Sequence, residues 1–237
     1  MLTLILALSL CAGDDDTAAT TALDRFKTDY KAKDASGRAA AVTELARTQH
    51  EKVWARLGQM LVVDEKEIRI AAAKGLVGVT ENKKKAAAYL MAATAPNAKE
   101  PVVLAAILEA LGKVKDASGA PEVEKNFKSK QIPVAKAAIE AAGEIGSRGS
   151  VEPLIDTLKW LESNAQDAPA YGAGGGGAKT PAVGGNGTSD ASAKERDAAL
   201  RPVVLKTLAA LTKTSHSSVK EWSDWWRAEG AKFMSGK

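Results

Sequence analysis

One pattern recurs along the chain with a period of about 30–40 residues, and it constrains the fold more than any other feature. Its copies start at residues 68, 103 and 134, and a weaker copy begins at Val203. Each copy opens with an aliphatic residue, continues with small residues and reaches a branched residue near a glycine or threonine. A stripe of small residues lets a neighbouring helix approach closely, and a glycine near the end terminates a helix. The pattern therefore predicts repeated, closely packed helices.

A second amphipathic helix follows the small-residue helices. The clearest is 151–161, which carries Pro153 in its first turn. Its apolar residues fall on one face: Val151, Leu154, Ile155, Leu158 and Leu161. Aromatic residues make up only 5% of the chain while alanine, the best helix former, is abundant. Because no convincing period-2 segment is present, the sequence predicts an all-α fold.

Two stretches carry a resemblance to a known family. Residues 61–64 leading into 68–72, and residues 134–146 leading into 151–155, resemble HEAT repeats. The resemblance covers roughly 35–162 and, more loosely, 195–235. It implies a right-handed α-solenoid of stacked antiparallel helix pairs. The family's usual arginine occurs only as Arg69, so the resemblance implies an incomplete polar ladder between repeats.

The chain divides into HEAT-like repeats at 17–162, a Gly-rich linker at 163–194, and a final helix pair with a cap at 195–235. About 30 such residues span roughly 30 Å as a random coil, which is ample for a loop inserted in one continuous solenoid. Two separate domains are the alternative. The glycines at 172–177 match a dinucleotide fingerprint, but these motifs need a preceding strand and a following helix. Nucleotide binding is therefore not expected.

The N-terminus predicts export. Residues 2–10 form an apolar run that is too short to span a bilayer and fits a signal peptide at 1–13, although no basic residue follows Met1. The segment ending in Cys11 resembles a bacterial lipobox, in which the cysteine is lipidated; Leu10 departs from that pattern. Cleavage after Ala12 or Gly13 is the alternative. We expect a periplasmic or envelope protein whose one membrane contact would be a lipid on Cys11.

No motif in the sequence predicts catalysis or a cofactor. The two histidines, His50 and His216, lie far apart and lack metal-ligand spacing. The 33 basic and 29 acidic residues are interspersed, with a net charge of +4. This balance is typical of a solvated surface rather than of a dedicated nucleic-acid binder. We therefore expect neither an enzyme nor a metal or cofactor site.

Tryptophans cluster near the C-terminus. Trp222, Trp225 and Trp226 share one stripe of a predicted helix that starts with a capping box of Ser218 and Glu221. The last repeat of a solenoid needs a cap because no neighbour covers its face. The segment also resembles the closing segment of some secreted bacterial HEAT-repeat proteins. A structural cap is the favoured interpretation, and a carbohydrate or peptide platform is the alternative.

Two features could bind a partner. Trp160 lies about 180° from Val151 on its helix and is predicted to point outward. Six lysines on two helices could align into a basic patch: Lys83, Lys84, Lys85, Lys125, Lys128 and Lys130. The alternative is a solvated face, because acidic residues lie among them. The sequence favours a monomeric, non-enzymatic scaffold for another protein; the alternative is a binder of nucleic acid or acidic polysaccharide, and nucleic acid is the less expected partner.

Overall fold

The computed structural model describes residues 11–31, 34–167 and 193–236. These residues are 81% helical, and no strand occurs among them, so the all-α prediction is confirmed. The α-helices are α1 Cys11–Lys31, α2 Ala35–Leu45, α3 Glu51–Val63, α4 Lys66–Val77, α5 Lys83–Thr94, α6 Pro101–Val114, α7 Ala120–Glu124, α8 Ile132–Ile145, α9 Val151–Asp167, α10 Ala193–Thr212 and α11 Val219–Ser235. Two short 3₁₀ turns, η1 Ala117–Gly119 and η2 Arg148–Ser150, precede α7 and α9.

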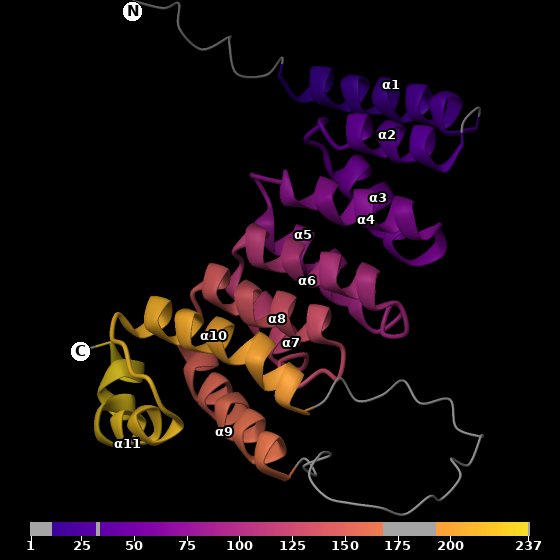
Figure 1. Ribbon diagram of the computed structural model, residues 1–237. Coiled ribbons are helices and arrows are strands. Elements are labelled where there is room, and N and C mark those ends of the chain that lie inside the picture. The colour runs from indigo at the N-terminus through magenta and orange to yellow at the C-terminus, as the bar shows by residue number, and fades with distance from the viewer. Residues whose placement is uncertain (1–10, 32–33, 168–192, 237) are drawn as a thin grey trace, which may run out of the picture.

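The helices pack in two rows. In one row α2, α4, α6, α8 and α10 each contact the next. In the other row α1 contacts α3, α3 contacts α5, and α5 contacts η1 beside the short α7. Across the rows each helix contacts its partner, from α1 with α2 to α9 with α10. Figure 1 shows the resulting stack, which begins at α1 and α2 and reaches α9 at its other end.

Small residues lie where helices of the first row approach most closely. The recurring small-residue segments of the sequence fall on α4, α6, α8 and α10. A Cβ atom on Gly112 of α6 would lie 2.7 Å from Ala141 Cα of α8, and one on Gly143 would lie 3.1 Å from Thr207 Cγ2 of α10. A Cβ atom at Gly112 would clash with the backbone of α8, and one at Gly143 would require Thr207 to shift slightly. The small residues therefore lie at close contacts between helices, as expected.

Glycine ends a helix, as expected, at Gly78 after α4 and at Gly146 after α8, but not at Gly112 in α6. Gly146 ends α8 in the left-handed region, with φ of 75°. Gly112, by contrast, lies inside α6, which ends instead at Lys115 with φ of 57°. The packing against Ala141 explains why α6 carries a glycine two residues before its last.

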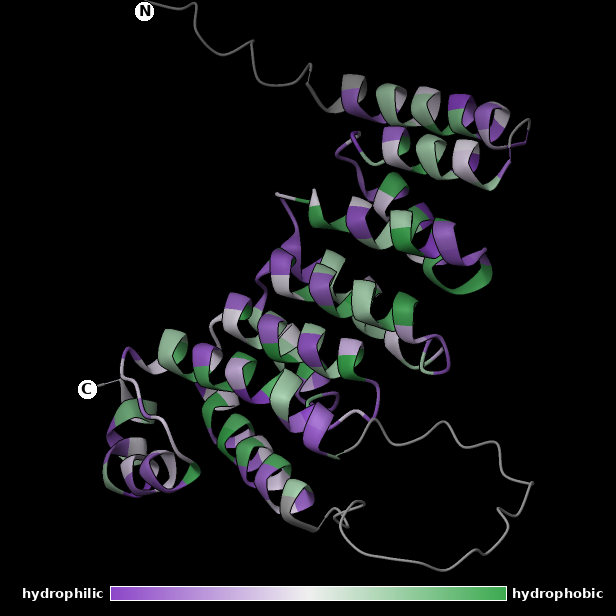
Figure 2. Cartoon of the chain, in the orientation of Figure 1, coloured by the Kyte–Doolittle hydropathy of each residue, from purple (hydrophilic) through white to green (hydrophobic). Residues whose placement is uncertain are grey.

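The core runs through the stack between the two rows. Fully buried side chains include Leu57 and Met60 of α3, Ile107 of α6 and Ile139 of α8. Figure 2 shows hydrophobic residues on helix after helix along the stack. Each fully buried side chain of this size contributes about 1.5–3 kcal/mol, and most of this contribution depends on the neighbouring helices of the stack.

Two boundaries differ from the sequence expectation. Helix α9 continues to Asp167, past residue 162, where we expected the repeats to end. Helix α10 starts at Ala193 and contacts both α8 and α9. Most of the predicted linker, including the glycines that match nucleotide-binding motifs, lies at 168–192 and outside the described residues.

The predicted export segment lies largely outside the described residues as well. Cys11 is the first residue of α1, and residues 1–10 are not described. Among the described helices, none combines the length and the apolar composition that crossing a membrane requires.

Candidate interaction surfaces

Polar contacts join successive helix pairs at a nearly constant sequence separation of 26–28 residues. Their distances are 2.7 Å for Arg38–Glu65, 2.7 Å for Arg69–Asn97, 2.7 Å for Thr94–Glu122 and 2.6 Å for Ser150–Glu124. Arg69 and Arg38 each take part in a link between pairs, while the other two links join a hydroxyl to a glutamate. These contacts fix the register of the stack rather than form a site.

Asn97 is, like Ser150, a fully buried polar group among these contacts, and no sequence motif marks it. Its side chain is fully buried, and its Nδ2 donates to Leu61 O at 2.9 Å and to Ala93 O at 2.7 Å. Its Oδ1 accepts from Arg69 Nη1 at 2.7 Å. The amide is thus satisfied within the protein and ties α3, α4 and α5 together.

The first three candidate lysines lie in the first turn of α5. Lys83 and Lys84 are exposed, while Lys85 forms an ion pair with Glu51 of α3. Hydrogen bonds from Ser118 lower the pKa of the Asp116 carboxyl, and the charges of Lys84 and Lys83 lower it further. These lysines therefore face acidic groups on both neighbouring elements.

The other three candidate lysines lie at the opposite end of α5. Lys125 pairs at 2.6 Å with Glu122, which accepts a hydrogen bond from Thr94, the last residue of α5. Because a helix rises 1.5 Å per residue, Lys84 and Thr94 are about 15 Å apart along the axis. Lys128 and Lys130 continue beyond Lys125 and are exposed. The six lysines therefore form two separate groups, and the structure does not align them into one patch.

Trp160 does not stand free on the surface. It is half-buried, and the guanidinium of Arg196 of α10 lies 5.5 Å from the centroid of its ring, within range of a cation–π interaction. Its carbonyl accepts a hydrogen bond of 2.6 Å from Asn164. Helix periodicity alone predicts an outward tryptophan here, because the sequence does not show that α10 lies beside α9.

The C-terminal tryptophans form one aromatic cluster. Trp222 is fully buried, and its Nε1 donates to His216 O at 3.2 Å. Trp225 contacts Trp222 with ring centroids 5.6 Å apart and Phe233 with centroids 5.7 Å apart. The predicted capping box of Ser218 and Glu221 is present at the start of α11. Helix α11 contacts α9 and η2, where Arg148 lies over the ring of Phe233 at 5.3 Å.

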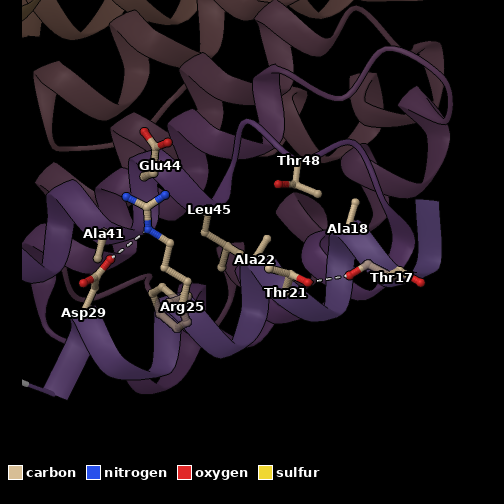
Figure 3. A pocket seen from close by; sticks show the side chains of 11 residues that line it. Thr17, Ala18, Thr21, Ala22, Arg25, Asp29, Ala41, Glu44, Leu45 and Thr48 are labelled. Carbon is tan, nitrogen blue, oxygen red and sulfur yellow. Dashed lines mark hydrogen bonds and ion pairs between the residues drawn. The ribbon is translucent and has the colours of Figure 1, made fainter. Parts of the chain in front are cut away.

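A groove lies between α1 and α2 (Figure 3). Its volume is about 550 Å³. Small residues line it, among them Ala18 and Ala22 of α1 and Ala41 of α2, with the buried side chains of Phe26 and Leu45 also in its wall. Because α1 and α2 are the first described helix pair, no preceding described pair covers this side of the stack.

Each carboxylate along this groove is paired with a base. Asp29 and Glu44 line it together with Arg25, whose Nε lies 3.6 Å from Asp29 Oδ2. An adjoining hollow of about 260 Å³ adds Asp16 and Asp24. All of these side chains are well exposed, and bases outside the groove also contact three of the four carboxylates. Exposed pairs of this kind contribute little and can exchange partners.

The sequence did not predict the groove, although it shows the residues of one of its two walls. Ala18, Ala22, Arg25 and Asp29 recur at the three- and four-residue spacing of one helix face. The opposite wall comes from α2, and only the packing of α1 on α2 brings the two faces together.

Comparison with models of known protein families finds no match for this chain, and no curated protein is significantly similar to it in sequence. In the described part of the chain, no three histidine, cysteine, aspartate or glutamate side chains gather as metal ligands would. The arrangement of side chains on the helices therefore carries the functional argument.

Proposed function

We propose that the protein is a non-enzymatic scaffold that binds another protein, built as a right-handed α-solenoid of the HEAT type. The observation that supports this is the repeated contact of each helix pair with the next, through polar links of 26–28 residues separation. Stacked repeats expose long continuous surfaces, and such surfaces are suited to binding extended partners.

Helix α11 serves, in this proposal, as the C-terminal cap of the solenoid. Its buried Trp222 and its contacts with α9 and η2 support the cap over an exposed aromatic platform. Trp225 and Trp226 are only half-buried, so their outer edges remain accessible to solvent.

Export to the cell envelope completes the proposal, with residues 1–13 as the export signal. Lipidation of Cys11 would anchor the protein to a membrane, whereas cleavage after Ala12 or Gly13 would release it. Mass spectrometry of the mature N-terminus distinguishes the two: a lipidated Cys11 as first residue supports the anchor, and a free Gly13 or Asp14 supports release. An intact Met1 in the cell envelope fraction contradicts both.

The alternative, an anionic polymer bound by the lysines, has less support. The two lysine groups lie at opposite ends of α5, and Lys85 and Lys125 are engaged by Glu51 and Glu122. A polymer site would gain from adjacent, unpaired cations, because these displace the counterions condensed on the polymer.

A pull-down from envelope extract tests the scaffold proposal. The purified chain is used at about 0.15 M and about 0.5 M salt. The Debye length is markedly shorter at the higher concentration, so charge interactions are weaker there. A variant with all six candidate lysines changed to Gln is run in parallel. A specific protein retained at both salts by both versions supports the scaffold. Capture of nucleic acid or acidic polysaccharide that is lost at high salt and in the Gln variant would favour the anionic-polymer alternative over the scaffold.

A further inference from the structure

We propose that one edge of the stack, the basic edge, contacts anionic lipid headgroups while the protein is anchored through Cys11. This inference rests on the proposed lipidation of Cys11 and adds a second membrane contact to it. The basic edge consists of five lysines at the ends of α4, α5 and α6: Lys74, Lys83, Lys84, Lys113 and Lys115.

The lysines of the basic edge come together because α5 begins at the edge where α4 and α6 end. Hydrogen bonds from Ser118, and then two lysine charges, lower the pKa of the Asp116 carboxyl. These two lysines, Lys84 and Lys83, belong to the first turn of α5, so this turn lies beside the end of α6. All five lysines are exposed, and in the part of the chain that the structure describes none of them forms an ion pair.

Positive charge is in excess at the basic edge. The turn between α4 and α5 supplies one carboxylate, Glu81, and the turn after α6 supplies another, Asp116. Glu144 at the end of α8 is followed at the same edge by the exposed cation Arg148. Five lysines against two carboxylates at the ends of α4, α5 and α6 leave this edge free to attract an anionic surface.

The opposite edge of the stack is balanced instead. There the exposed Lys66 is followed directly by Glu67, and Lys99 by Glu100. Each of these carboxylates is exposed as well, so it offsets the neighbouring lysine. Charge alone therefore favours one edge over the other as the face toward an anionic surface.

The start of α1, where Cys11 lies, belongs to the basic edge too. Asp16 of α1 lies 3.0 Å from Lys52 at the start of α3. Glu51, also at the start of α3, pairs with Lys85 in the first turn of α5. These ion pairs join the starts of α1, α3 and α5 along one edge. Because packed helices are about 8–10 Å apart, the starts of α1 and α5 are about 20 Å apart.

Two membrane contacts at this separation would fix how the stack sits on a membrane. A lipid on Cys11 would bring the edge to the headgroups, and lysines within about a Debye length of an anionic leaflet are attracted to it. The aspartates that follow Cys11 oppose contact there, so the attraction comes from the ends of α4, α5 and α6. A soluble anionic polymer could meet the same lysines, but the anchor on the same edge favours the membrane.

Sedimentation with lipid vesicles tests the proposal. The probes are vesicles of phosphatidylcholine with about 30% phosphatidylglycerol and vesicles of phosphatidylcholine alone, at about 0.05 M salt. The mature chain from Asp14 is used, so that the apolar residues 2–10 do not contribute. We expect binding to the anionic vesicles only, and release at about 0.5 M salt.

Two matched variants locate the contact, and circular dichroism checks that both fold. Four lysines of the basic edge are changed to Gln in the first, which should bind about tenfold or more weakly: Lys83, Lys84, Lys113 and Lys115. The second removes the same charge from the opposite edge and should bind as the wild type does: Lys66, Lys99, Lys128 and Lys130.

Three results would overturn the proposal. Equal binding to both kinds of vesicle would show no preference for anionic lipid. Equal losses in the two variants would show an effect of net charge rather than of one edge. Tighter binding to a short duplex DNA than to the anionic vesicles would assign the lysines to a polymer.

The anchor and the scaffold are tested separately from the basic edge. A lipidated Cys11 found by mass spectrometry, without any preference for anionic vesicles, leaves the anchor standing and overturns the basic edge. Vesicle binding that the first variant loses, with a free Gly13 or Asp14 in the mature protein, supports the basic edge and removes the anchor. A protein captured from extract equally by the wild type and the first variant supports the scaffold, with a binding surface away from the basic edge.

Discussion

Gly112 shows how a single residue sets the spacing of two helices. It lies inside α6, where an alanine would be the better helix former by about 1 kcal/mol. The backbone of Ala141 on α8 occupies the space that a Cβ atom would need. Close approach of the helices therefore outweighs helix propensity at this position.

We expect Gly112→Ala to lower the free energy of unfolding by about 1–2 kcal/mol, because a new methyl group 2.7 Å from Ala141 Cα costs about 1–3 kcal/mol and exceeds the gain in propensity. Chemical denaturation measures the change. Gly78→Ala is the control: Gly78 has φ of −69° and its nearest neighbour at 3.4 Å, so stability should hold or rise slightly. A more stable Gly112→Ala protein would contradict this packing.

The Tyr30 hydroxyl links the first helix pair to the second, and its pH dependence is testable. It donates a hydrogen bond to Asp64, and burial together with this bond raises the pKa of Tyr30 to about 12 from 10.0. Because the raised pKa favours the protonated form in the folded state, its contribution is complete below pH 10 and is lost as pH rises toward 12.

We therefore expect the stability of the wild type to fall between pH 10 and 12 more steeply than that of Tyr30→Phe. Urea denaturation across this pH range measures the free energy of unfolding of both proteins. Taking the difference between them removes the contribution of the lysines, which titrate in the same range in both. Parallel pH profiles of the two proteins would show that Tyr30 does not titrate as the structure indicates.

At the scale of elements, α11 depends on its aromatic face more than on any backbone link to the stack. Trp222 is fully buried, whereas Trp226 is half-buried and packs beside Gly230 of its own helix. The capping box fixes where α11 begins, but the free energy that holds it against α9 and η2 comes from burial of the rings.

We expect Trp222→Ala to destabilise the protein by about 3–5 kcal/mol, and Trp226→Ala by clearly less, because the loss follows the buried volume removed. Urea denaturation gives the two values, and limited proteolysis shows whether α11 becomes accessible first. Equal losses for the two substitutions would mean that Trp222 is not the anchor of the helix.

At the scale of the whole molecule, the contacts run mainly from each helix to its partner and its row neighbours. Internal helices such as α6 have neighbours on both sides along their row, whereas α1 and α11 lie at the ends of the stack. Stability in such an arrangement approximates a sum of local terms and interfaces between neighbours.

Hydrogen exchange should therefore be slowest in α4, α6 and α8 and faster in α1 and α11. Exchange measured by mass spectrometry on the native protein resolves these helices. Uniform protection along the chain would show that the molecule opens only as a whole, and slower exchange in α1 than in α6 would contradict the contact pattern.

The sequence alone determined the helical class, the capping box of α11 and the small residues at helix contacts, since each depends on residues within about one helix. The tertiary structure decided what lies side by side. It separated the six lysines to the two ends of α5, placed Arg196 over Trp160 and joined α1 with α2 into a groove. Periodicity fixes which face of a helix is apolar, but neighbours about 30 residues away fix what that face meets, and their register comes from packing.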